Sequence, residues 1–190
     1  MKAVLISIRP NWCELIAKLE KTIEVRKTKP AIEAPFKCFI YCTKDNSGIM
    51  RSQIWKHNNH VMNGKVIGEF ICDKIITVDC DSVAPFDPET HEYIDQECCF
   101  GRETLWEYTN GYCCYGWHIS NLVIYDEPKE LSEFYTTCED FRCEGCEHLK
   151  YMPVNSSEYD YECEYDGYHK PINRAPQSWC YVEEVTIPWS

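Results

Sequence analysis

The apolar residues of this chain gather mainly in short runs that have the length and composition of β-strands. The runs are rich in β-branched, aromatic and cysteine side chains, and they occupy residues 3–8, 22–26, 36–42, 65–71 with an extension at 75–78, 117–125 and 179–187. Shorter helices are expected around residues 49–57, 102–108 and 128–134, and an acidic surface loop is expected over residues 79–96. Strands of this number with few helices predict a mainly β domain of the α+β class, built as a barrel or a sandwich.

A change of period near Lys21 predicts a junction between a helix and a strand. Asn11 is expected to cap a helix in which apolar residues recur at positions 12, 15, 16 and 19. From residue 22 to residue 26 the pattern alternates, which places Thr22, Glu24 and Arg26 together on one face of a half-buried strand.

The length of 190 residues predicts a single domain, residues 1–190. No apolar run approaches the roughly 20 residues that a membrane span needs, and the apolar start lacks the features of a signal peptide. We therefore expect a cytoplasmic protein without a membrane partner.

The charge is divided unevenly along the chain. The net charge of -12 argues against a non-specific nucleic-acid binder, which needs a basic surface. Residues 1–75 nevertheless hold 13 basic against 7 acidic residues, a balance of +6, whereas residues 76–190 hold 6 against 24, a balance of -18. Two interpretations follow: an anionic ligand meets the first half, or the acidic second half engages a basic protein partner.

Residues 136–173 form a cysteine-rich stretch that almost lacks aliphatic periodicity and is expected to be an insertion in the domain. Within it Cys138, Cys143, Cys146 and Cys163 have a C-x4-C-x2-C-x16-C spacing. Four thiolates suit a structural Zn²⁺, which would supply the folding energy that such an insertion lacks. The alternative is a set of unligated, reduced thiols.

The run from Ala17 to Lys27 resembles the signature of the ASCH domain in the PUA-like superfamily, Gly-x-Lys-x-x-Glu-x-Arg. Lys21, Glu24 and Arg26 fill its three polar positions, and Leu19 stands where glycine is usual. Residues 64–70, 115–119 and 175–182 are similar to strands of bacterial and phage ASCH proteins. The resemblance implies a PUA-like pseudo-β-barrel with a cleft beside the first helix, related to folds that bind RNA or read modified bases.

The expected ligand is RNA, a modified nucleoside or a nucleotide, held by Lys21, Thr22, Glu24 and Arg26. An ammonium, a carboxylate and a guanidinium offer donors and an acceptor to a base edge or a phosphate. The alternative for the same residues is a plain cross-strand network of ion pairs.

Trp117 and His118 follow a glycine and are further candidates for ligand contacts, with the indole ring stacking on a base. The alternative places Trp117 in the core and His118 at a strand edge.

One ASCH branch resembles an N4-acetylcytidine amidohydrolase, which implies that this chain is either a binding module or an enzyme. The branch uses the signature lysine and a threonine three residues after it. In this chain Lys21 matches that lysine, but Glu24 occupies the position of the threonine. If the chain is an enzyme, Lys21, Thr22 and Glu24 are its expected catalytic residues.

Overall fold

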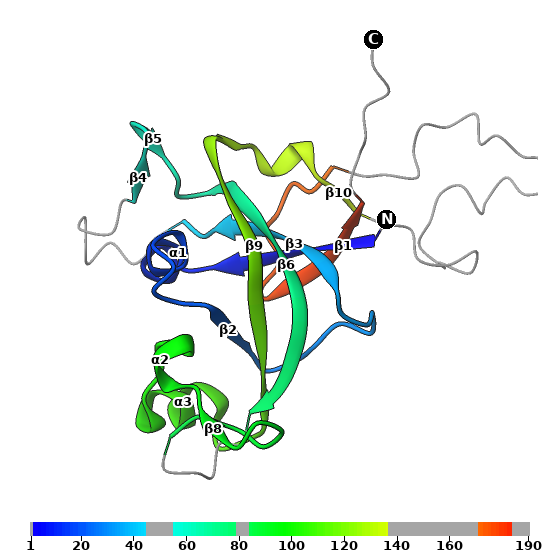
Figure 1. Cartoon of the computed structure of the whole chain (residues 1–190). Coiled ribbons are helices and arrows are strands. Elements are labelled where there is room, and N and C mark those ends of the chain that lie inside the picture. The colour runs from blue at the N-terminus through cyan, green and yellow to red at the C-terminus, as the bar shows by residue number, and fades with distance from the viewer. Residues whose placement is uncertain (1, 45–54, 79–83, 137–170, 184–190) are drawn as a thin grey trace, which may run out of the picture.

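The computed structural model describes residues 2–44, 55–78, 84–136 and 171–183. Seven of its strands form one sheet in the order β10-β11-β1-β3-β6-β9-β2 (Figure 1). These strands are β1 (Lys2–Ile8), β2 (Ile23–Arg26), β3 (Phe36–Cys42), β6 (Lys65–Val78), β9 (Cys114–Lys129), β10 (Tyr135–Thr136) and β11 (Trp179–Glu183). The pairing of β1 with β3 is parallel, and every other pairing in this sheet is antiparallel.

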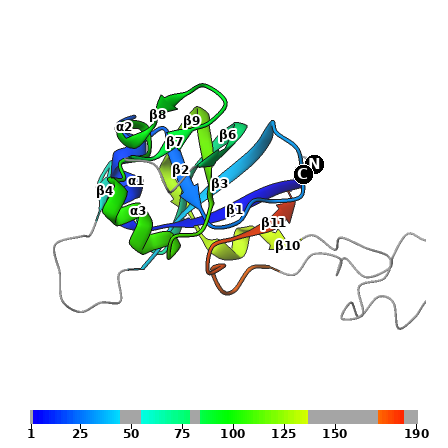
Figure 2. The ribbon, with the colours of Figure 1, turned by 90° about the horizontal axis from the view of Figure 1, so that it is seen from below.

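Four short strands and four helical segments complete the described elements. The strands form two hairpins, β4 (Lys56–His57) with β5 (His60–Val61) and β7 (Phe86–Asp87) with β8 (Glu92–Tyr93). The helices are α1 (Pro10–Ala17), α2 (Asp95–Cys98), α3 (Arg102–Thr109) and the 3-10 helix η1 (Leu131–Glu133). Figures 1 and 2 both place α1, α2 and α3 at one side of the sheet, away from β10 and β11.

The sheet curls without a backbone ladder between its outer strands. Within the described ranges no pairing joins β2 to β10 or β11. Side chains bridge the gap instead: the Trp179 indole donates to Thr28 Oγ1 at 3.0 Å, and the Ala31 amide donates to the Tyr181 hydroxyl oxygen at 2.7 Å. The predicted pseudo-barrel is therefore a seven-stranded mixed sheet that stays open in its backbone pairing.

Gly68 lies where the two longest strands change register. Between Val66 and Gly68 the register of β6 shifts against both β3 and β9, and against β9 it shifts again between Glu69 and Ile71. A Cβ atom at Gly68 would lie 2.3 Å from the carbonyl oxygen of Val123 on the neighbouring strand. Only glycine admits that approach, so the sheet can bend at this point.

Several predicted element bounds are wrong. The first helix begins at Pro10 and uses Arg9 as its N-cap in place of Asn11, because proline suits the first helical position. Pro128 was expected to begin a helix, but it lies inside β9, and the short 3-10 helix η1 follows that strand. The predicted loop over residues 79–96 contains the β7–β8 hairpin and the start of α2. Of the polar stretch 49–57, residues 56–57 form a strand, and 49–54 lie outside the described residues.

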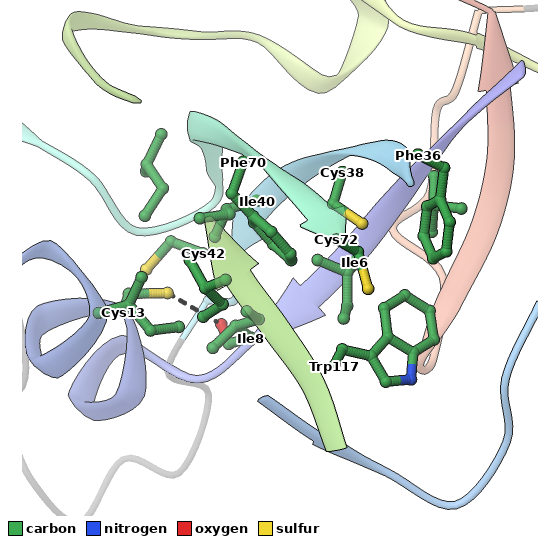
Figure 3. Packing of buried hydrophobic residues seen from close by; sticks show 14 of the residues in the cluster. Ile6, Ile8, Cys13, Phe36, Cys38, Ile40, Cys42, Phe70, Cys72 and Trp117 are labelled. Atoms are coloured by element: carbon green, nitrogen blue, oxygen red, sulfur yellow. Dashed lines mark hydrogen bonds between the residues drawn. The ribbon is translucent and has the colours of Figure 1, made fainter. Parts of the chain in front are cut away.

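The main core lies inside the curl of the sheet and includes four buried cysteines. Cys13, Cys38, Cys42 and Cys72 pack with isoleucines, Phe36, Phe70 and Trp117, as Figure 3 shows. Burial raises the pKa of the Cys72 thiol to about 12 and also raises the pKa of Cys13 and Cys38. The thiols of Cys13, Cys38 and Cys72 are therefore neutral, and they serve as small apolar side chains.

Two further clusters of apolar residues cover the outside of the sheet. One joins β2 and β6 to α2 and α3 through Ile23, Val25, Ile76 and Leu105, among others. We call this one the outer cluster; because it lies against Ile23 and Val25, it closes the apolar side of β2 to water. No described helix is both long and apolar enough to pass through a bilayer.

Candidate functional site

The turn that follows α1 brings Lys21 to its place. The Leu19 amide donates to the Ile16 carbonyl and the Glu20 amide to the Leu15 carbonyl, each at 2.9 Å. This pair of bonds is the Schellman arrangement, in which the first of the two donor residues takes the left-handed conformation. Leu19 supplies it with a φ of 60°, although glycine is the residue that takes this conformation without strain. Leu19 thus lies outside the helix, 67% exposed, and its predicted place on the apolar face is wrong.

Replacing Leu19 with glycine is expected to raise the free energy of unfolding by about 1 kcal/mol, since a non-glycine residue pays for the left-handed conformation and an exposed leucine loses little packing. The melting temperature should rise by roughly 2–4 °C. Thermal unfolding measures the melting temperature, and urea unfolding measures the free energy of unfolding. Asn110→Gly is the matched control, because asparagine at a φ of 55° already tolerates the conformation and should gain less. A stability of Leu19→Gly equal to or below that of the wild type would contradict the left-handed conformation assigned to Leu19.

Lys21 is a buried lysine, 1% exposed, held by aromatic rings and a carbonyl group. Its ammonium nitrogen lies 5.1 Å from the ring centroid of Trp12 and 5.2 Å from that of Phe100. It donates a hydrogen bond to the carbonyl oxygen of Cys98 and lies 3.6 Å from Glu24 Oε2. Ring quadrupoles and a carbonyl dipole stabilise the charged form of a lysine away from water.

Glu24 and Arg26 meet Lys21 in the interior. Arg26 Nη1 lies 2.8 Å from Glu24 Oε1, and Arg26 Nη2 donates to the backbone oxygen of Ser7 at 2.6 Å. Glu24 is 3% exposed and Arg26 is 8% exposed. We refer to Lys21, Glu24 and Arg26 as the polar cluster; with two cations and one anion it carries a formal charge of +1.

The prediction of a half-buried strand at residues 22–26 is therefore wrong in one respect. All four residues of β2 are buried, including those of its polar face. The apolar face packs against the outer cluster, and the polar face points into the curl of the sheet. Buried charges must be paired to be tolerated, which accounts for the close contacts within the polar cluster.

Three buried polar atoms at this place have no hydrogen-bond partner among the described residues. They are Glu24 Oε2, Arg26 Nε and Trp117 Nε1, one acceptor and two donors. Buried polar groups in proteins are nearly always bonded, so each exception calls for a physical reason. A ligand that presents complementary groups is such a reason.

The strand register decides which predicted residues join the polar cluster. Glu24 pairs with Trp117 and Arg26 pairs with Tyr115, and directly opposite residues of antiparallel strands share a face. His118 pairs with Ile23 and lies on the other face, where its Nδ1 is 2.6 Å from Asp73 Oδ1. The structure therefore brings Trp117 to the polar cluster and keeps His118 away.

Trp117 is fully buried, with its ring centroid 5.7 Å from that of Phe36 and 6.0 Å from that of Trp179. The ring is thus a core aromatic, in agreement with the alternative stated for it above. Only its N–H group, which has no hydrogen-bond partner among the described residues, is available to a ligand.

Thr22 is half-buried and precedes β2; its amide donates to the Glu97 carbonyl at 2.9 Å.

Sequence reasoning missed Trp12, Phe100, Cys98 and Ser7 as neighbours of the polar cluster. Trp12 fell within the predicted helical pattern, which gave it no role beyond packing. Cys98 is the last residue of α2 and Phe100 follows this helix, which no pattern in the sequence indicated. Ser7 contributes a backbone oxygen, and no side-chain motif could indicate it.

The predicted zinc ligands Cys138, Cys143, Cys146 and Cys163 lie outside the described residues, as does most of the predicted insertion 136–173. In the ranges that the structure covers, no group of three or more His, Cys, Asp or Glu side chains is arranged to hold a metal ion.

A mixed sheet of mostly antiparallel strands, a helix after the first strand and a buried polar cluster at the second make up an α+β fold. The chain resembles the crystal structure of ASCH from Zymomonas mobilis, with a TM-score of 0.54, 15% identity, and coverage of 96% of this chain and 88% of that chain. A serine-to-alanine mutant of that protein matches with a TM-score of 0.53, 15% identity and coverage of 96% and 89%. No family model and no curated protein matches the sequence. This chain has the fold of an ASCH domain, as the resemblance in its sequence implied.

Proposed function

We propose that this protein binds RNA, a modified nucleoside or a nucleotide at the polar cluster. The observation that carries the proposal is the set of three buried polar atoms, on Glu24, Arg26 and Trp117, that have no hydrogen-bond partner among the described residues. One acceptor beside two donors complements a flat ligand that presents an N–H group next to a carbonyl oxygen, as the pairing edge of a nucleobase does. The fold shared with ASCH structures supports the same class of ligand.

The charge of the polar cluster narrows the chemistry of the ligand. Two cations face one carboxylate, so an electron-rich or anionic group is favoured over a cationic one. In our proposal Glu24 accepts from a ring N–H or an exocyclic amine of the base, and Arg26 Nε donates to its carbonyl. Lys21 then sets the electrostatic potential at the carboxylate without needing to touch the ligand.

Glu24→Gln tests the proposal, because it keeps the shape of the side chain and removes the charge and one acceptor. We expect affinity for the best ligand in a panel of ribonucleosides, nucleotides and short RNA to fall about tenfold to a hundredfold, the cost of losing a charged hydrogen bond. Titration calorimetry measures it, and Arg26→Ala should weaken binding as well.

Glu69→Gln is the matched control for this titration, since its carboxylate also pairs with a lysine, Lys37, at 3.2 Å, but lies outside the polar cluster. It should bind like the wild type. Absence of binding by the wild type across the panel, or unchanged affinity in Glu24→Gln, would refute the proposal.

A second candidate is an amidohydrolase that splits N4-acetylcytidine with water into cytidine and acetate. It is favoured by the start of β2 at Ile23. Neighbouring residues within a strand point to opposite faces, but Thr22 precedes the strand, so its side chain is not forced away from Lys21. Including N4-acetylcytidine in the same panel and assaying acetate tests it. Release by the wild type and none by a folded Lys21→Ala variant would favour this candidate, and no release by the wild type would reject it.

A further inference from the structure

Two lysines directly after β2 stand over tyrosine rings. Lys27 Nζ lies 5.2 Å from the ring centroid of Tyr108, and Lys29 Nζ lies 5.3 Å from that of Tyr115. Both lysines are exposed and both tyrosines are partly buried. We call these four residues the lysine–tyrosine pairs.

The lysine–tyrosine pairs border the polar cluster. Tyr115 is directly opposite Arg26 across β2 and β9, so its ring lies on the face that also carries Glu24 and Trp117. Tyr108 lies on the other side, against Phe100, one of the rings beside Lys21, with centroids 5.8 Å apart. The two pairs thus flank the end of β2 from its two sides, next to the buried site.

The segment that carries the two lysines, residues 27–31, is held in place. Thr28 accepts a hydrogen bond from Trp179, and the Ala31 amide donates to Tyr181. Pro30 between these contacts is buried. A segment that is fixed before binding loses little conformational freedom on binding, so the backbone that carries the two lysines is positioned in advance.

The charge of this segment contrasts with that of the whole chain. Residues 21–29 hold four basic residues, Lys21, Arg26, Lys27 and Lys29, and one acidic residue, Glu24, which gives +3 in a chain of -12. A local excess of positive charge selects a polyanion, and aromatic rings beside it select one that carries flat groups. Single-stranded nucleic acid has both properties.

We infer that the protein binds single-stranded nucleic acid across the end of β2, with phosphates on Lys27 and Lys29 and bases on Tyr108 and Tyr115. This inference rests on the proposed function, in which one base enters the polar cluster. An exposed cation–π contact is weak, so each lysine readily leaves its ring for a phosphate and exposes the ring face for stacking. The preferred ligand is then a strand of several nucleotides rather than a free nucleoside.

The double variant Lys27→Ala/Lys29→Ala tests the inference. Affinity is measured by fluorescence anisotropy for a single-stranded RNA of about six nucleotides, the DNA of the same sequence and a free nucleoside, at several salt concentrations. We expect oligonucleotide affinity to fall about tenfold or more and the slope of log affinity against log salt to shrink by about 1.4, the value for two lost phosphate contacts to a single strand. Binding of the nucleoside should not change, and comparison of the RNA and DNA arms identifies the natural strand.

Lys37→Ala/Lys129→Ala is the matched control. It removes the same charge from two lysines that also stand over rings, 5.7 Å from that of Phe39 and 4.8 Å from that of Tyr125, away from the polar cluster. This variant should bind the oligonucleotide like the wild type.

The outcomes separate the inference from the proposed function. If the lysine variant leaves oligonucleotide affinity and salt slope unchanged while the nucleoside binds, the inference is wrong and the proposed function stands. If the lysine variant loses the oligonucleotide but Glu24→Gln does not, the inference stands and the polar cluster is not the site. Equal losses in the two lysine variants would mean general charge attraction and would overturn the inference.

Discussion

Arg26→Ala should lower the free energy of unfolding by about 3–5 kcal/mol, because it leaves the buried carboxylate of Glu24 without its closest cation. The Ser7 carbonyl loses its donor in the same step. Lys21 remains, but at 3.6 Å from the carboxylate it replaces only part of the lost interaction. The melting temperature is expected to fall by roughly 10 °C, and urea unfolding gives the free energy directly.

Two comparisons make this result specific. Lys37→Ala breaks the pair with Glu69, whose side chains are 24% and 26% exposed, and should cost no more than about 1 kcal/mol because water screens that pair. The triple variant Lys21→Met/Glu24→Leu/Arg26→Met removes all three charges of the polar cluster and should recover most of the loss, since apolar side chains replace a buried ionic cluster at little cost. A loss below about 1 kcal/mol for Arg26→Ala would mean that the polar cluster is solvated.

Trp117→Ala is expected to lower the free energy of unfolding by about 3–5 kcal/mol, the usual cost of deleting a large buried aromatic side chain. Trp117→Phe should cost much less, because the ring still fills most of the space beside Phe36 and the deleted N–H has no partner among the described residues. Trp106→Ala on α3, where the indole is 47% exposed, is the control and should stay within about 0.5 kcal/mol of the wild type.

The phenylalanine variant also distinguishes the two interpretations of Trp117. If the indole N–H contacts the ligand, Trp117→Phe loses affinity while its stability stays close to that of the wild type. If Trp117 serves the core alone, affinity follows stability and stays unchanged in Trp117→Phe. A small loss of stability in Trp117→Ala would contradict the assignment of the ring to the core.

Local patterns in the sequence were enough to predict the longer strands of the main sheet and the side-by-side placement of Glu24 and Arg26. The run 36–42 is strand β3 to the residue, and the strand expected at residues 3–8 is β1. Alternation put Glu24 and Arg26 on one face, and they do form an ion pair there. These features depend on residues close together in the chain, and periodicity records such relations directly.

Burial of the polar cluster could not be predicted in this way. Lys21 finds its acceptor in Cys98, 77 residues later, and Arg26 finds one in Ser7, 19 residues earlier. Both acceptors are backbone oxygens, so no residue type indicates them. The alternation showed which residues share a face, but only the packing of α2 and the core against β2 shows that this face is closed to water.

The end of the first helix shows a second limit. Helical spacing extended the apolar face to Leu19, yet the helix ends at Ala17. Helix ends are usually recognised by glycine, and here a leucine takes the left-handed conformation in its place. The residue types therefore did not indicate the end of the helix, although the turn itself has the ordinary hydrogen bonds.

The gap between β2 and β11 forms a seam, that is, a line along which the described residues make no backbone pairs. Across it the described residues place a few side-chain hydrogen bonds, each contributing on the order of 1 kcal/mol, whereas the ladder between β1 and β3 would have to break along its whole length. We expect that an opening at this gap would expose Arg26 and leave the backbone pairing of the sheet intact. We therefore expect the fold to open most easily beside the polar cluster.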